Sequence, residues 1–387
     1  MSLRHEFVSL ALQETANIAE LCRRFGVSRQ NGYKWLKRYH SGGVEALADR
    51  SRRPQKMPRL TGPEVEQALI ALRLEQPAWG PRKLRRRLED LGMKGLPAPS
   101  TIGAVLRRAG LIETAASAAH RAYVRFERAA PNELWQMDFK GHFALSRGGR
   151  CHPLTVLDDH ARYLLGLRAC AQQNDATVRP HLHDLFARYG LPEHLLCDHG
   201  PPWSGCGGEW TSLAVWLVRL GIRILHGRPH HPQTQGKEER LHRTLKAELL
   251  CRTDLRDLAQ SQVHFDHWRL LYNQQRPHEA LGMATPATRY TPSQRSMPAT
   301  LPAIEYGPGD EVRLVKSKGE ITWRNRTYYI GRGFVRQPVA LRATSTDGLF
   351  KVYFCHQYLG SIDLRLPPAI SKHHYLPLLK TSPLPSL

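Results

Sequence analysis

Residues 134–170 read LWQMDFKGHFALSRGGRCHPLTVLDDHARYLLGLRAC, and this stretch decides the fold of the middle of the chain. Its apolar residues form three short runs with β-strand patterning, each bounded by turn-forming residues. Glycine and aspartate favour turns, so we expect breaks at Ser146-Arg147-Gly148-Gly149 and at Asp159-His160. The three expected strands cover residues 134–145, 151–158 and 162–170.

Helices and strands alternate after these three strands. Apolar spacing predicts helices over residues 175–189, 210–220 and 236–250. Short strands are expected between them, one leading into Asp198 and one near residues 223–227. Three consecutive strands followed by alternating elements indicate an α/β core, which we place at residues 132–292.

Three acidic residues fall in three separate motifs of this core. Asp138 ends the run Trp135-Gln136-Met137, Asp198 follows Leu195-Leu196-Cys197, and Glu239 stands three residues after Gly236. Taken singly, an aspartate at a strand end is usually a turn residue and a glutamate on a helix is usually solvated. The joint pattern is far more specific: Trp-x-x-Asp-Phe, Asp-x-Gly and His-Pro-x-Thr-x-Gly-Lys-x-Glu-Arg occur in that order. It resembles the catalytic core of the DDE-type insertion-sequence transposases, which are related to retroviral integrases.

The resemblance implies a ribonuclease-H-like fold and metal-dependent phosphoryl transfer. Two magnesium ions, for which manganese can substitute, activate the attacking oxygen and stabilise the leaving one, and such hard cations require oxygen ligands. By resemblance Asp138 would bridge both ions, Asp198 would hold one and Glu239 the other. No side-chain nucleophile is needed, since water attacks first and a DNA 3′-hydroxyl attacks afterwards. Glu238 competes with Glu239, but the Gly-x-x-Glu and Glu-Arg spacing selects Glu239.

Other polar residues of the core have less specific settings. Lys237 and Arg240 flank the helical acid, and we expect both to contact phosphate; the alternative is that either serves only as a surface charge. Asp158 and Asp159 are interpreted as turn-forming residues.

The composition fits a DNA partner. The chain has 56 Lys and Arg against 34 Asp and Glu among 387 residues, so its formal charge is +22 and its pI is about 10.1. Such a charge attracts a polyanion, and counterion release from neutralised phosphates makes the binding strong and salt-sensitive. We therefore expect double-stranded DNA as the partner: by resemblance, the terminal inverted repeats of a mobile element and a target DNA.

Residues 1–53 contain an expected helix-turn-helix. Gly26 can take the left-handed conformation that closes a first helix, and Ser28 can cap the next one through its hydroxyl. The alternative is an ordinary helical hairpin with a solvated basic face. The side chains presented to a major groove would be Arg29, Gln30, Asn31 and Lys34. The extended linker that follows resembles that of the same transposases, and we expect its Arg52 and Arg53 to contact DNA.

Residues 60–113 contain a second expected helix-turn-helix. The run Trp79-Gly80-Pro81-Arg82-Lys83-Leu84, with Pro99-Ser100-Thr101-Ile102 after it, looks like the second DNA-binding unit of these transposases. We expect Arg82 and Lys83 to contact DNA and Ser100-Thr101 to cap the last helix. The three arginines after Leu84 could simply form a solvated helix face.

Strand patterns return at residues 304–366. Short apolar runs separated by turns predict a small antiparallel β-barrel, like the one that follows the core in several transposases. We expect Trp323, Tyr328 and Tyr329 to line its core; the alternative is that they stack on nucleic acid.

Several classes of protein are disfavoured. Seven cysteines without a Cys-x-x-Cys pair are typical of reduced thiols, not of a disulfide framework, and no His and Cys cluster has zinc-finger spacing. The first residues lack the apolar run of a signal peptide, and no stretch approaches the roughly 20 apolar residues of a membrane span. We expect a cytoplasmic, nucleoid-associated protein without a membrane partner.

These features predict a multidomain transposase that acts as a homo-oligomer on DNA. It would bind the terminal inverted repeats of its element, cleave strands with magnesium and join the exposed 3′ ends to a target. Two alternatives stay open. A DNA-binding regulator without catalysis would not need the intact acidic residues, and a ribonuclease-H-like nuclease without strand transfer would not need tandem end-reading units.

Overall fold

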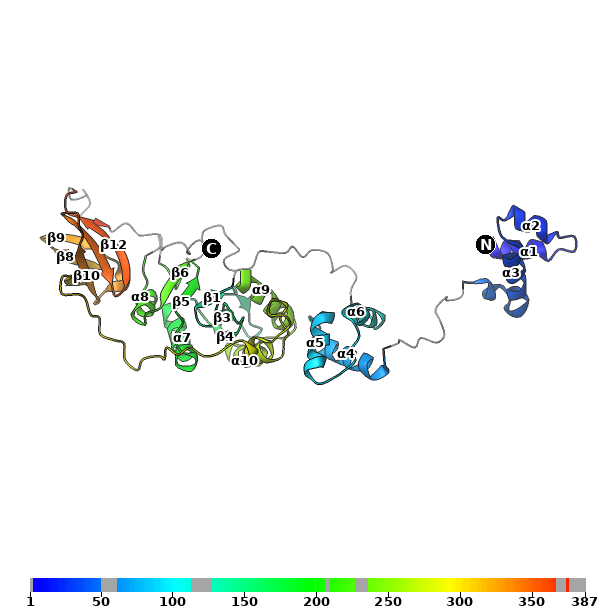
Figure 1. The fold of residues 1–387 in the computed structure, drawn as a ribbon, viewed down its shortest axis with the longest axis horizontal. Coiled ribbons are helices and arrows are strands. Elements are labelled where there is room, and N and C mark those ends of the chain that lie inside the picture. Colours follow the sequence, from blue (N-terminus) through cyan, green and yellow to red (C-terminus); the bar gives the residue numbers. More distant parts are fainter. Residues whose placement is uncertain are drawn as a thin grey trace. The chain divides into compact units, whose positions relative to one another are not determined.

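The computed structural model describes residues 3–49, 61–112, 127–198, 200–205, 209–226 and 236–366, and the backbone of residues 374–375. The chain divides into two compact units, Met1–Thr61 and Gly62–Leu387. Figure 1 shows their helices and strands, coloured along the sequence. No helix among the described residues is long and apolar enough to cross a membrane.

The first unit contains a helix-turn-helix. Its elements are α1 (Leu3–Ala11), α2 (Ile18–Arg24), α3 (Arg29–Gly42) and the 3-10 turn η1 (Val44–Leu47). Gly26 has φ 62° just after α2, and the Ser28 hydroxyl caps α3 by accepting a hydrogen bond from the Asn31 N–H at 3.3 Å. The expected turn and cap are confirmed. Helix α1 is additional, and it supplies the fully buried Phe7 and Val8.

A glycine lets α3 pack closely against α1 and α2. A Cβ added at Gly32 would lie 2.7 Å from the Cys22 Sγ and 2.9 Å from the Phe7 Cζ, closer than packed side chains come. One face of α3 is therefore buried against the bundle, and the opposite face is left to solvent.

Three further helices open the second unit. They are α4 (Pro63–Glu75), α5 (Pro81–Asp90) and α6 (Pro99–Arg108), and each begins with proline, whose fixed φ suits the first helical position. Their shared core includes Leu69, Trp79, Leu84 and Ile102. The expected cap of α6 by Ser100-Thr101 is wrong: its N-cap is Ala98, without a side-chain hydrogen bond, because the helix starts at the proline itself.

The central sheet is mixed. Its strands are β1 (Leu134–Phe139), β2 (Phe143–Ala144), β3 (Arg150–Asp158), β4 (Leu164–Cys170), β5 (His194–Cys197) and β6 (Arg223–His226). The order is β2-β3-β1-β5-β6, with β4 paired on β3; β1, β3 and β4 are antiparallel, and β5 and β6 run parallel to β1. The single strand expected over 134–145 is interrupted, because Gly141 takes φ 75° between β1 and β2.

Helices cover both faces of this sheet, as Figure 1 shows. They are α7 (Asp175–Tyr189), α8 (Ser212–Arg219), α9 (Gly236–Leu245), a π-helical turn η5 (Lys246–Leu250) and α10 (Leu258–Gln274). On one face Phe186 of α7 and Trp216 of α8 pack with Trp135. On the other, Leu241 of α9 and Phe265 of α10 pack with strand residues such as Leu157. The expected alternation of strands and helices is confirmed.

The carboxyl-terminal region forms two sheets around one core, not a closed barrel. Its strands are β7 (Glu311–Leu314), β8 (Glu320–Trp323), β9 (Arg326–Tyr329), β10 (Pro338–Ala343), β11 (Leu349–Phe354), β12 (Gln357–Asp363) and β13 (His374–Tyr375). One sheet has the order β12-β11-β10-β7 and the other β13-β9-β8. The expected barrel is wrong, because turns at Gly319 (φ 82°) and Gly331 (φ 137°) set the β8–β9 hairpin apart from the ladder of β7 and β10. Trp323 and Tyr328 are buried in the shared core, as expected, and Tyr329 is half-buried.

Candidate active site

Asp138 and Asp198 meet at one edge of the central sheet. Asp138 is the fifth residue of β1, and Asp198 directly follows β5. The two strands are parallel and pair Gln136 with Leu196, so the same register continued by two residues sets Asp138 opposite Asp198. Adjacent strands lie about 5 Å apart, and the carboxyl ends of parallel strands share one edge. Backbone pairing therefore brings together two of the three acids expected from the sequence.

The two charges oppose each other. Burial, and then the negative charge of Asp198, raise the pKa of Asp138 to about 6, while the Phe139 N–H and the charge of Lys140 act the other way. The Phe139 N–H donates to Asp138 Oδ1 at 2.8 Å, and the Gly200 N–H donates to Asp198 Oδ1 at 3.1 Å. Two half-buried carboxylates that repel each other attract a positive charge, and their oxygen atoms suit a divalent cation.

Glu238, not Glu239, contacts this edge. Its side chain is 1% exposed, and the Thr155 Oγ1 lies 2.9 Å from Glu238 Oε2, 3.0 Å from the backbone oxygen of Asp138 and 2.9 Å from His242 Nε2. A threonine hydroxyl has one proton and can donate to only one of these partners. Since the Asp138 carbonyl only accepts, three simultaneous hydrogen bonds require both Glu238 and His242 to donate to Thr155. A protonated Glu238 fits its burial, which with the charge of Asp138 raises its pKa well above the ordinary value.

Glu239 lies on the exposed side of the first turn of α9. Around a helix axis His242 projects about 40° and Glu239 about 100° from Glu238. His242 Nδ1 is 3.9 Å from Asp138 Oδ2, so Asp138 faces the helix between the directions of the two glutamates. Within the described residues, no three acidic, histidine or cysteine side chains already converge as a metal-binding group. The structure thus brings Asp138 and Asp198 together with Glu238 and leaves Glu239 beside them, open to solvent.

The two basic neighbours of the acids on α9 differ. Lys237 is 14% exposed at its side chain and forms an ion pair with Asp159, whereas Arg240 is exposed. Burial lowers the pKa of Lys237 to about 8, against the opposing charge of Asp159. Phosphate contact by either residue stays a prediction.

The residues expected to read DNA in the first unit are all exposed. They are Arg29, Gln30, Asn31 and Lys34. At about 100° per residue, Gln30 and Lys34 lie on the side of α3 opposite the buried Gly32, and Arg29 lies about 60° from Gly32. Tyr33, 59% exposed, lies between Arg29 and Gln30 around the helix. The exposed side of α3 therefore includes an aromatic ring among its polar side chains. Arg52 and Arg53 lie outside the described residues.

The second helical unit presents fewer free charges. Arg82 is exposed, but burial and the charge of Arg276 lower the pKa of Lys83 to about 8. Arg85 and Arg86 form ion pairs one turn along α5 with Glu89 and Asp90. These arginines therefore balance acids of their own helix, as the solvated-face alternative for them implied.

Sequence reasoning missed Thr155, His242 and the full role of Asp159. Asp158 is the last residue of β3 and is turn-forming as expected: its carboxylate accepts from the Asn132 and Ala161 N–H groups at 2.8 and 2.7 Å. Asp159 instead accepts from Gln136 and Lys237, far away in the sequence. A signal for Glu238 and His242 did exist, because both continue the buried spacing of Leu241 and Leu245 along α9.

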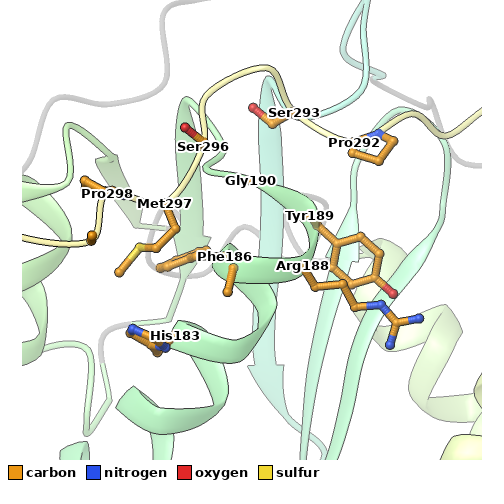
Figure 2. Close-up of a pocket in the computed structure, with 12 residues that line it drawn as sticks. His183, Phe186, Arg188, Tyr189, Gly190, Pro292, Ser293, Ser296, Met297 and Pro298 are labelled. Atoms are coloured by element: carbon orange, nitrogen blue, oxygen red, sulfur yellow. The ribbon is translucent and has the colours of Figure 1, made fainter.

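A pocket of about 510 Å³ lies elsewhere in the core. Figure 2 shows the last turns of α7, with His183, Phe186 and Tyr189, facing the segment of residues 292–299. Gly190 of this pocket precedes β5, so the pocket lies toward the amino ends of the parallel strands, away from the edge with Asp138 and Asp198. It has no acidic lining residue, and we assign it no part in the chemistry.

Known protein families match separate parts of the chain. The matches are "Integrase core domain" at residues 128–232 and again at 220–286, "Homeodomain-like domain" at 31–106, "Helix-turn-helix domain" at 4–55, and "IS481 family transposase, C-terminal domain" at 310–367. They cover the helix-turn-helix, the acidic sheet edge with α9 and the carboxyl-terminal sheets in the order in which these occur.

Relatives of the chain come from insertion elements. A protein of insertion element IS407 from Burkholderia multivorans is 28% identical over 286 residues, which are 72% of this chain and 92% of that protein. A protein of insertion element IS476 from Xanthomonas euvesicatoria is 30% identical over 181 residues, 46% of this chain and 49% of that protein. Among solved structures, the chain is similar to a chain of a simian T-cell lymphotropic virus intasome. The match covers 77% of this chain and 97% of that chain, with 15% identity and a TM-score of 0.36.

Proposed function

Because the chain is a DDE integrase-like transposase, a polynucleotidyl transferase that binds DNA and performs strand cleavage and transfer, we propose that it acts on the terminal inverted repeats of its own element and joins them to a target DNA. The regulator and simple-nuclease alternatives are not needed once helix-turn-helix domains, integrase core and transposase domain stand in one chain.

The observation that carries the proposal is the pairing of Asp138 with Asp198 at the sheet edge. Strand chemistry in an integrase core depends on a divalent metal. We propose magnesium, as two ions with manganese able to substitute, held by Asp138, Asp198 and Glu239. The residues fit, since strand pairing sets two carboxylates at one sheet edge, and burial and then the charge of Asp198 raise the pKa of Asp138. When bound, the metal activates the attacking oxygen and stabilises the leaving one.

The chain's own residues hold this arrangement in place. Thr155 binds the backbone oxygen of Asp138 and the carboxyl of Glu238, and so fixes β1 against α9. The Gly200 N–H orients the Asp198 carboxylate. Glu239 lies on the exposed side of the first turn of α9, and we assign it the third carboxylate because of the Gly-x-x-Glu and Glu-Arg spacing.

Recognition of the element ends is assigned to α3. Arg29, Gln30, Asn31 and Lys34 would enter a major groove, with Arg52, Arg53, Arg82 and Arg240 contributing phosphate contacts. We propose that the protein works as a homo-oligomer on DNA, because two ends must be joined to one target. DNA contact by Lys83 is the least favoured of these predictions, since its ammonium is largely enclosed.

The test uses the full chain and duplexes that match the inverted repeats flanking its gene. With magnesium, a labelled terminal duplex should be cut at its 3′ end and joined to plasmid DNA. A scrambled duplex of the same length and composition is the control. Equal cutting of both duplexes, or no joined product, would refute the proposal.

A further inference from the structure

A buried carboxylate ties the start of α9 to β1. Asp159, in the turn after β3, is 0% exposed and accepts hydrogen bonds on both oxygens. The Arg128 N–H donates to Oδ2 at 2.9 Å, and the Gln136 Nε2 donates to Oδ1 at 2.6 Å. The Lys237 Nζ donates to Oδ1 as well, forming an ion pair, and lies 3.4 Å from the Asp159 backbone oxygen.

The two long-range donors stand next to the acids. Gln136 lies two residues before Asp138 on β1, and Lys237 lies two residues before Glu239 on α9. Side chains two apart on a strand share one face, so Gln136 and Asp138 are on the same side of the sheet. Asp159 thus joins β1, which carries Asp138, to α9, which carries Glu239. The separation of β1 and α9 sets the distance between these two acids.

The surroundings of Lys237 favour this internal partner over DNA. A charge as enclosed as this ammonium is costly without a counter-charge, and Asp159 supplies one. Arg240, one turn along the same helix, is exposed and reaches solvent freely. Of the two basic residues flanking the acid, only Arg240 is placed as a phosphate contact would require.

We propose that Lys237 is a positioning residue: its ion pair with Asp159 docks the first turn of α9 on the β1 edge, and so delivers the following acid to Asp138 and Asp198. This rests on the proposed function, because it assigns α9 the third carboxylate of the strand-transfer site. It gives Lys237 a role different from the phosphate contact expected from its sequence position.

The test compares Lys237→Met, Asp159→Asn and the double variant with wild type. We expect each single variant to lower the single-turnover cleavage rate about tenfold to a hundredfold, as for groups that orient a metal ligand. DNA affinity and its salt dependence should stay unchanged. The double variant should be no worse than the poorer single one, because the two substitutions remove the same interaction.

Arg240→Met serves as the comparator for a phosphate contact. It should weaken DNA binding and reduce the log–log salt slope by about 0.9. If Lys237→Met shows that signature while Asp159→Asn leaves cleavage intact, Lys237 binds phosphate and the proposal is wrong.

Hydrogen exchange of the α9 amides, measured without DNA or metal, gives a readout independent of activity. We expect faster exchange of the amides of residues 240–243, which donate to the carbonyls of the first turn of α9, in Lys237→Met and in the double variant, and unchanged protection there would overturn the proposal. The double variant removes both members of the ion pair, so it tests the proposal if a single variant does not fold.

If the wild-type protein does not cleave DNA, the proposed function is wrong. Hydrogen exchange and the salt slope still test whether the ion pair positions α9.

Discussion

The acidic edge of the core sheet and the exposed face of α3 handle charge in opposite ways. At the sheet edge, Asp138 is partly removed from water beside Asp198, and its pKa rises to about 6. On α3, the polar side chains of Arg29, Gln30 and Lys34 stand in solvent. The acids assigned to chemistry therefore lie where burial and a neighbouring like charge disfavour their charged forms. The residues assigned to recognition stay in water, so their charges lower the stability of the fold little. Substitutions in the two regions should differ in kind as well as in size.

The largest effect is expected at the sheet edge. Asp138→Asn and Asp198→Asn keep the side-chain volume but remove a charged ligand, which supplies several kcal/mol of charge stabilisation, so cleavage should fall by about a thousandfold or more. Terminal-duplex affinity, measured by anisotropy, should be unchanged because α3 is untouched. A variant that retains full strand transfer removes its residue from the site.

Glu239→Gln and Glu238→Gln separate the two glutamates of α9. We expect Glu239→Gln to lower cleavage about a hundredfold or more, as the loss of a group acting on the developing charge does. Glu238→Gln should lower it by only about tenfold, because an amide can still donate to Thr155 as the protonated carboxyl does. Single-turnover rates at saturating magnesium give both numbers. The reverse order would make Glu238 the third metal ligand.

The charged form of Asp138 should lower the free energy of unfolding of the protein. The folded pKa of Asp138 is about 6 against 3.8 for the free side chain, so the folded state binds the proton more tightly and loses stability as pH rises through this interval. In metal-free buffer at pH 7.5, Asp138→Asn should raise the free energy of unfolding by about 1–3 kcal/mol. The gain should shrink toward pH 4, where wild type is protonated too. Thermal melts of both proteins across this pH range measure it; a destabilised variant at pH 7.5 contradicts the account.

The smallest effect is expected on α3. Gln30→Ala should reduce the preference for terminal over scrambled duplex by about 1–3 kcal/mol if Gln30 reads a base, with no change in melting temperature. Lys34→Ala, the neighbouring charge, should weaken both duplexes alike if it meets phosphate. Competition binding at one salt concentration distinguishes them. An unchanged specificity ratio in Gln30→Ala and Arg29→Ala would move end recognition to the second helical unit.

Local signals were enough to locate much of this molecule. Ser28 and Gly26 mark the turn before α3 because caps and left-handed glycines depend on a few neighbouring atoms. The alternation of strands and helices predicted the α/β core and a strand that leads into Asp198. The choice of Asp138, Asp198 and Glu239 as metal ligands was suggested by the resemblance to the transposase family.

The remainder depends on contacts between distant parts of the sequence. The ion pair of Lys237 with Asp159 joins residues 78 positions apart, and neither residue carries a local sign of the other. The spacing of Glu238 to Leu241 and Leu245 could have predicted that Glu238 is buried. A buried glutamate needs a polar partner, however, and the sequence did not show that Thr155 supplies it. The open arrangement of β7 to β12 likewise follows from which strands pair, which short apolar runs do not specify.

Direct measurement of cation binding is the most decisive test of the sheet-edge site. Manganese binding to the full chain at pH 7.5 can be followed by calorimetry for wild type, Asp138→Asn and Asp198→Asn, without DNA. The account predicts a wild-type site that both variants lose, in parallel with cleavage. Undiminished manganese binding in both variants would contradict it.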